Sequence, residues 1–195
     1  MAVKQVTLNG EFQLKGRGLH TGQEVCVTFK PAPEDTGYQI VRTDIEGSPV
    51  IPATAAYAKD ADRSSCLEKD GIRIFTMEHA LSALYGCGID NCIMELTGDE
   101  FPILDGSAKY YVENIAKVGT IEQSKDRNYF IVREKLEYAN PETGTKITIL
   151  PDSEFSVNTL ISYDSPYLAM QYANYNESDM NYATEVAPCR TCVFL

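Results

Sequence analysis

Histidine and long apolar runs are both scarce in this chain of 195 residues. Only His20 and His79 are present, so a site that uses imidazole to hold a metal or move a proton has few places to form. No stretch approaches the roughly 18 apolar residues of a membrane-spanning helix, and residues 1–12 lack the apolar core of a secretion signal. These absences favour a cytoplasmic globular protein without a transmembrane segment.

Basic residues are also in short supply. The chain has 17 lysines and arginines against 28 aspartates and glutamates, which gives a formal net charge of -11. A surface of this charge repels phosphate backbones, and the sequence contains no local basic cluster to offset the repulsion. We therefore expect no nucleic-acid partner.

The features of a disulfide-stapled secreted domain are missing as well. The chain is neither short nor signal-bearing, so we interpret its six cysteines as free thiols. Cys189 and Cys192 have the spacing of half a zinc knuckle or of a redox pair, but no second such pair accompanies them. A structural Cys/His zinc protein nevertheless stays open as one interpretation.

The first 122 residues predict an α+β domain. Strands are expected at 4–8, 11–15, 24–30, 38–42, 72–75 and 90–96, where β-branched and aromatic residues lie between Gly or Pro turns. Helices are expected at 77–85, with Thr76 as N-cap, and at 108–117, with Ser107 as N-cap. Strands followed by helices in this order predict a two-layer sandwich with the helices on one side of the sheet.

A polar linker at 123–128 is expected to lead into a second domain at 129–195. Strands at 129–138, 145–150, 154–163 and 189–195 and a short helix after Ser178 are predicted there. Residues 21–44 and 141–164 keep their apolar positions in phase at an offset of 120, which favours two similar α/β sandwich domains, the second one truncated. An uncovered sheet edge in the second domain predicts a dimer or poor solubility.

Glu78 and His79 are the most informative pair in the chain. Consecutive residues on a helix point about 100° apart, so one side chain can hold a metal while the other addresses a bound water. A carboxylate that is not a ligand can then act as general base. The plainer interpretation is a glutamate stabilised by the helix dipole beside an exposed histidine.

Three further segments carry candidate residues. In GRGLHTG, glycines surround His20 and allow close approach of a ligand, although a simple β-turn explains them equally well. Thr191 has a hydroxyl that can donate to an oxyanion, or it is a buried strand threonine. Asp105-Gly106-Ser107 is either a turn with an N-cap or a polar support for an active site.

Taken in order, GRGLHTG, Glu78-His79, GIDN, FPILDGSA and PCRT resemble UDP-3-O-acyl-N-acetylglucosamine deacetylase, the zinc amidase of lipid A biosynthesis, over residues 6–195. The resemblance implies zinc-dependent removal of acetate from a nucleotide-sugar lipid precursor. It also implies two similar α+β domains that enclose the active site between their helical layers.

Residue roles follow from the same resemblance. His79 is expected to be a zinc ligand, Glu78 the general base and Thr191 the oxyanion donor. Five residues are expected to bind substrate or border its site: Leu19, His20, Arg63, Ser64 and Asp105. Ser65 and Cys66 belong to the same loop as Arg63 and Ser64. Cys192 stands where the family usually has phenylalanine, so that wall of the site differs.

The resemblance further implies an N-terminal fragment. The family's His-Lys-x-x-Asp helix, which brings two more zinc ligands, and its later catalytic histidine have no counterpart in these residues. Because catalytic zinc sites use three protein ligands, weak zinc binding and negligible turnover are expected of the chain alone. The alternative of a different class is a non-catalytic α+β binding or assembly module in which Glu78 and His79 are surface residues.

Overall fold

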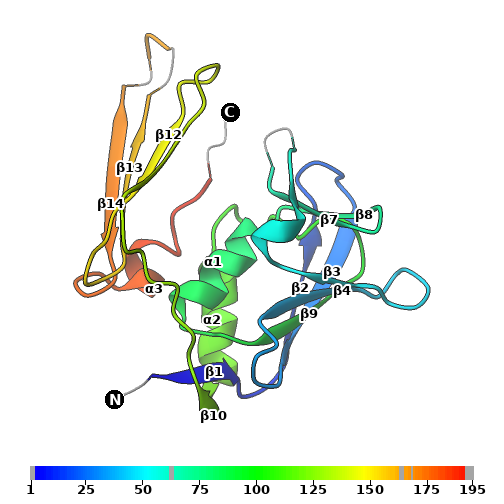
Figure 1. Ribbon diagram of the computed structural model, residues 1–195. Coiled ribbons are helices and arrows are strands. Elements are labelled where there is room, and N and C mark those ends of the chain that lie inside the picture. The colour runs from blue at the N-terminus through cyan, green and yellow to red at the C-terminus, as the bar shows by residue number, and fades with distance from the viewer. Residues whose placement is uncertain (1–2, 62–63, 163–164, 168, 192–195) are drawn as a thin grey trace. The chain divides into compact units, whose positions relative to one another are not determined.

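The computed structural model describes residues 3–61, 64–162, 165–167 and 169–191 (Figure 1). The chain divides into two compact units. Unit 1 comprises Met1–Arg127 together with Tyr182–Leu195, and unit 2 comprises Asn128–Asn181. Arg63 and Cys192 lie outside the described residues, and so does most of the strand predicted at 189–195.

A five-stranded sheet forms the centre of unit 1, in the order β2-β3-β9-β4-β5. Its strands are β2 (Phe12–Arg17), β3 (Glu24–Pro31), β4 (Tyr38–Arg42), β5 (Val50–Pro52) and β9 (Cys92–Leu96). Strand β9 is antiparallel to β3 and parallel to β4. Val25, Val27 and Phe29 alternate along β3 and are buried, so one face of the sheet belongs to the core.

Two smaller sheets complete the strands of unit 1. One contains β6 (Ala58–Lys59), β7 (Cys66–Lys69) and β8 (Ile72–Phe75), and it follows the 3-10 helix η1 (Ala55–Tyr57). In the other, β1 (Lys4–Leu8) pairs with β10 (Thr120–Asp126). The linker predicted at 123–128 is therefore strand as far as Asp126, because its polar residues pair through their backbone with β1.

Helices α1 (Glu78–Gly86) and α2 (Lys109–Val118) pack against each other on one side of the five-stranded sheet (Figure 1). The predicted α+β class is thus confirmed. Thr76 is not the N-cap of α1, because the cap position is Met77 and the Thr76 hydroxyl donates to Glu100 instead. Ser107 is likewise not the N-cap of α2, because the cap position is Ala108, but the Ser107 hydroxyl accepts a hydrogen bond from the Lys109 amide, 3.2 Å away.

Aromatic rings connect the sheet to α2. Phe12 stacks on Phe29 with ring centroids 4.6 Å apart, and Phe29 meets the edge of Tyr111 at 5.7 Å. Phe29 and Tyr111 are almost fully buried. Such aromatic pairs add roughly 0.5–1.5 kcal/mol each beyond their buried area, so this cluster holds the two layers in register.

Unit 2 contains two β-hairpins. Strand β11 (Leu136–Ala139) pairs with β12 (Lys146–Ile149), and β13 (Ser156–Ile161) pairs with β14 (Gln171–Asn176). Strand β14 was not predicted, and the other three are shorter than expected. None of the described residues of unit 2 is buried. The similarity of two domains stays a prediction.

The chain continues into the short helix α3 (Tyr182–Glu185), which belongs to unit 1. Residues 189–191, where the last predicted strand begins, are not in a strand. The longest described helix has 10 residues, and within the described ranges no helix is long and apolar enough to cross a lipid bilayer.

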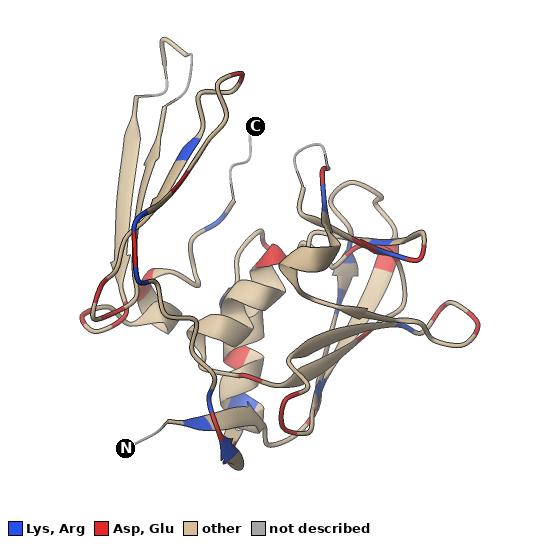
Figure 2. Cartoon of the chain, viewed as in Figure 1, with Lys and Arg blue, Asp and Glu red and all other residues tan. Residues whose placement is uncertain are grey.

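Acidic and basic residues are both found along the strands and loops (Figure 2). Lys30 on β3 pairs with Glu95 on β9 at 2.8 Å, and Lys4 on β1 pairs with Asp126 on β10 at 2.6 Å. Exposed pairs of this kind contribute little to stability.

Candidate active site

Glu78 and His79 open helix α1 and differ in exposure. The Glu78 side chain is 46% exposed, whereas that of His79 is 15% exposed. The imidazole Nε2 lies 4.0 Å from Glu78 Oε1. The carboxylate therefore faces solvent, and the imidazole beside it is largely buried but still partly accessible to solvent.

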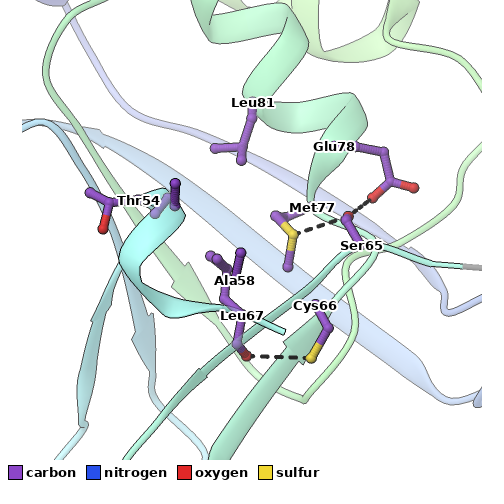
Figure 3. Close-up of a pocket in the computed structure, with 10 residues that line it drawn as sticks. Thr54, Ala58, Ser65, Cys66, Leu67, Met77, Glu78 and Leu81 are labelled. Atoms are coloured by element: carbon purple, nitrogen blue, oxygen red, sulfur yellow. Dashed lines mark hydrogen bonds between the residues drawn. The ribbon is translucent and has the colours of Figure 1, made fainter. Parts of the chain in front are cut away.

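The carboxylate of Glu78 is held by a serine from the preceding loop. The Ser65 hydroxyl lies within hydrogen-bond distance of Glu78 Oε2 and 3.2 Å from the sulfur of Met77 (Figure 3). Ser65 precedes β7, and Met77 is the last residue before α1. The hydrogen bond restricts the rotamers of an otherwise exposed side chain, so the direction of this carboxylate is fixed.

A pocket of about 220 Å³ lies directly beside Glu78 (Figure 3). Its walls come from the segment around η1, from β7 and from the start of α1. Apart from Glu78, Ser65 and Thr54, its lining side chains are apolar or thiol: Ala53, Ala55, Ala58, Cys66, Leu67, Met77 and Leu81. An apolar pocket edged by one carboxylate suits an apolar group placed next to a reacting polar bond.

A second, larger pocket of about 500 Å³ lies at the GRGLHTG loop. It brings together His20 and Ser64, two of the residues predicted to bind substrate. The other side chains that line it are Thr21, Asp60, Ala61, Arg73, Phe75 and Glu100. Leu19 is exposed beside His20 and is not in the lining. Polar groups of both charges make this pocket suited to a sugar or another polar ligand.

Glu100 is the residue of this region that the sequence did not reveal. Its side chain is 1% exposed and accepts four hydrogen bonds, from the His20 and Thr21 amides and from the Thr21 and Thr76 hydroxyls. Burial alone raises the pKa of the carboxyl, but these hydrogen bonds outweigh it, so the pKa lies below its ordinary value. The neighbouring sequence TGDEFP contains no signal for this role.

Thr76, two residues before Glu78, has an unusual backbone conformation. Its φ is +59°, which is rare for a β-branched residue, and it is buried. Its hydroxyl lies 3.1 Å from Glu100 Oε1 and 3.2 Å from the Ser64 hydroxyl. These contacts hold the strained residue in place, and strain of this kind is concentrated at functional sites.

Asp105 and Thr191 meet at a turn. Asp105 Oδ1 accepts hydrogen bonds from the Ser107 amide at 3.1 Å and the Ser107 hydroxyl at 2.7 Å. Burial raises the pKa of Asp105, but these bonds and nearby Arg190, whose Nε is 4.0 Å from Oδ2, lower it further than burial raises it. The Thr191 amide donates to the Gly106 carbonyl at 2.8 Å.

The interpretation of Thr191 as a buried strand residue is wrong. Thr191 is exposed and lies outside any strand. Its backbone is fixed to the turn by the hydrogen bond to Gly106. Thr191 lines neither of the two pockets, whereas Glu78 lines the first and His20 and Ser64 line the second.

Potential metal ligands are sparse. Among the described residues, no group of three or more His, Cys, Asp or Glu side chains is arranged to hold an ion. The five described cysteines are free thiols, as predicted. Burial raises the pKa of Cys92 to about 12 and also raises that of Cys66, so neither is a thiolate at neutral pH. His79, the imidazole beside Glu78, is the remaining candidate for a metal ligand at this site.

The chain matches one protein-family model, described as LpxC: UDP-3-O-acyl N-acetylglycosamine deacetylase, over residues 5–195. It is also similar to curated proteins of two kinds. The bifunctional enzyme LpxC/FabZ of Bacteroides thetaiotaomicron is 47% identical over 193 residues, which are 99% of this chain and 42% of that protein. The corresponding enzyme of Porphyromonas gingivalis is 44% identical, over 98% of this chain and 41% of that protein.

The relatives of the second kind are named as deacetylases alone. The UDP-3-O-acyl-N-acetylglucosamine deacetylase of Thermosynechococcus vestitus is 38% identical over 194 residues, covering 100% of this chain and 67% of that protein. The chain thus spans about two fifths of the bifunctional relatives and two thirds of this one.

Proposed function

This chain belongs to the LpxC family of UDP-3-O-acyl N-acetylglycosamine deacetylases, and on that premise we propose that it provides part of the active site for this deacetylation in lipid A biosynthesis. The substrate is a nucleotide-sugar lipid precursor, and acetate is released. The observation that carries the proposal is the Glu78 carboxylate, oriented by Ser65 and placed beside His79 at the start of α1.

Glu78 is proposed as the general base. It is half-exposed, so water can reach it, and the Ser65 hydroxyl fixes its direction. In amide hydrolysis the base takes a proton from the attacking water and can return it to the leaving amine. The pocket beside the carboxylate provides apolar walls next to this reacting centre.

His79 is proposed as one ligand of a zinc ion. Zinc, when bound, lowers the pKa of water and polarises a carbonyl. The described residues of this chain offer one imidazole at this place and no group of three potential ligands, so by themselves they do not fit a catalytic zinc site. We propose that the other ligands lie in the part of the relatives that this chain does not span.

The remaining residues are proposed to hold the substrate. The hydroxyl of Thr191, fixed through its backbone to Gly106, is the proposed donor to the oxyanion. His20 and Ser64 line the larger pocket, where a sugar fits, and Leu19 is exposed beside it. Asp105 supports the turn that meets Thr191. Arg63, which directly precedes Ser64 in the sequence and lies outside the described residues, is proposed as a substrate-binding residue from the resemblance alone.

The bifunctional relatives support a wider context. Their identities to this chain, 42–47%, exceed those of the single-activity deacetylases, 36–38%. We therefore propose that the gene encodes a bifunctional enzyme of the LpxC/FabZ kind, acting in the cytoplasm. The full reading frame tests this: a deacetylase that ends without a second enzymatic domain contradicts it.

Acetate release by the complete gene product tests the deacetylase proposal. The substrate is UDP-3-O-acyl-N-acetylglucosamine. Glu78→Gln is expected to lower kcat by about 10²-fold or more, because general-base assistance is lost, while bound zinc is retained. His79→Ala is expected to lower both zinc content and activity, because one ligand is removed. Zinc is measured by atomic absorption after dialysis.

Glu46→Gln is the matched control, because Glu46 is an exposed residue of unit 1 and the substitution removes one negative charge, as Glu78→Gln does. This variant is expected to behave as the unchanged protein. Near-normal acetate release by Glu78→Gln would refute the proposed base. Tight stoichiometric zinc in the 195-residue chain alone would refute the proposed division of the ligands.

A further inference from the structure

We infer that Glu100 is a positioning residue that ties the loop carrying His20 to the segment leading into Glu78. The contribution to catalysis rests on the proposed function. The tie itself is a property of the fold. Both carboxylate oxygens take part, and each accepts two hydrogen bonds.

The two oxygens serve different partners. Oε2 accepts the Thr21 amide at 2.9 Å and the Thr21 hydroxyl at 2.8 Å. Oε1 accepts the His20 amide at 3.0 Å and the Thr76 hydroxyl at 3.1 Å. Hydrogen bonds to a charged acceptor are stronger than neutral ones. One carboxylate therefore joins a loop about 80 residues earlier in the chain to Thr76, two residues before the start of α1.

The loop is wrapped tightly around this carboxylate. A Cβ atom on Gly18 would lie 2.2 Å from Glu100 Oε2 and 2.5 Å from the Thr21 hydroxyl. The absence of a side chain at this position is thus required for the loop to close on Glu100. Gly18 of GRGLHTG is thus required for a steric reason that involves Glu100, a residue outside the motif.

The same carboxylate fixes the walls of the larger pocket. His20, Thr21 and Glu100 line it, and Ser64 joins through Thr76. Glu100 is 1% exposed, and its oxygens already accept four hydrogen bonds. It can therefore affect a bound ligand only by holding the loop in position. This distinguishes it from Glu78, whose carboxylate faces solvent.

Glu100→Gln in the complete gene product tests the inference. With the amide oxygen in place of Oε1, the bonds to His20 and Thr76 persist, while the amide NH2 opposes the Thr21 amide. The bond from the Thr21 amide is then lost, while the loop keeps its bond from the His20 amide. We expect hydrogen exchange of the peptide covering residues 18–22 to accelerate about tenfold, and KM for the nucleotide-sugar substrate to rise about tenfold with kcat changed less than about threefold.

A merely structural role would lower Tm and the active fraction, which reduces kcat and leaves KM unchanged. That result, or exchange and KM both within about twofold of the unchanged protein, would overturn the inference. Glu46→Gln is the charge-matched control. If Glu100→Gln does not fold, Thr21→Val is the second variant. It removes the hydroxyl that donates to Glu100 Oε2 and accepts from the Gln23 amide, and smaller changes in the same direction are expected.

The two readouts separate this inference from the proposed function. Hydrogen exchange reports the loop whether or not acetate is released. If the unchanged protein shows no deacetylation, the proposed function fails, and exchange alone decides whether Glu100 holds the loop.

Discussion

Gly18 has no room for a side chain, and this makes it the most sensitive glycine near the candidate site. Gly18→Ala places a methyl group against the Glu100 carboxylate and the Thr21 hydroxyl. Because the clash involves a buried carboxylate held by four donors, we expect a loss of roughly 2–3 kcal/mol in unfolding free energy, measured by urea denaturation.

Gly10→Ala is the matched control for this change. A Cβ at Gly10 would meet the Val118 Cβ at 3.6 Å, an ordinary contact. The expected change is within about 1 kcal/mol. Equal stabilities of the two variants would show that the GRGLHTG loop does not close tightly on Glu100.

At the scale of the elements, the contact between α1 and α3 places the segment that carries Thr191. Tyr182 of α3 is 9% exposed, and its hydroxyl lies 2.6 Å from that of Ser82 on α1. A Cβ on Gly86 would lie 2.4 Å from the Tyr182 ring, so the ring packs directly on the helix backbone. The proposed oxyanion donor thus depends on how α3 docks.

Tyr182→Phe keeps the ring and removes the hydrogen bond to Ser82. We expect hydrogen exchange of residues 182–191 to accelerate about two- to tenfold, because a neutral hydrogen bond contributes about 0.5–1.5 kcal/mol. Tyr110→Phe, on the exposed face of α2, serves as control. Unchanged exchange in Tyr182→Phe would mean that the ring alone docks α3.

For the molecule as a whole, unit 2 is the part whose described residues form no buried core. Most of the large exposed apolar side chains belong to unit 2, among them Ile147, Leu160 and Tyr172 of its hairpins. Two hairpins without a buried residue are marginal in water. Exposed apolar strands of this kind pair with other chains.

We therefore expect the 195-residue chain to self-associate as protein concentration rises, measured by light scattering. The double change Ile147→Thr and Leu160→Thr keeps β-branched or polar strand residues and removes apolar surface, so it is expected to reduce association. A monodisperse monomer of the unchanged chain at high concentration would contradict the expectation.

The amino-acid sequence by itself determined the α+β class, the bounds of β1, β4 and β8, and the start of α1 to within one residue. It also placed Glu78 and His79 side by side at that helix start. These features depend on side-chain periodicity and on motifs of neighbouring residues, which a sequence displays directly.

The tertiary structure alone decided which distant residues meet. Glu100 accepts from donors 24 to 80 positions away, Ser65 holds Glu78 across 13, and the Thr191 amide reaches Gly106. The strand β10 is another case, since polar residues that suggest a linker pair with β1 through backbone groups common to all residues. Hydrogen bonds between remote segments depend on the path of the chain, and no local pattern records that path.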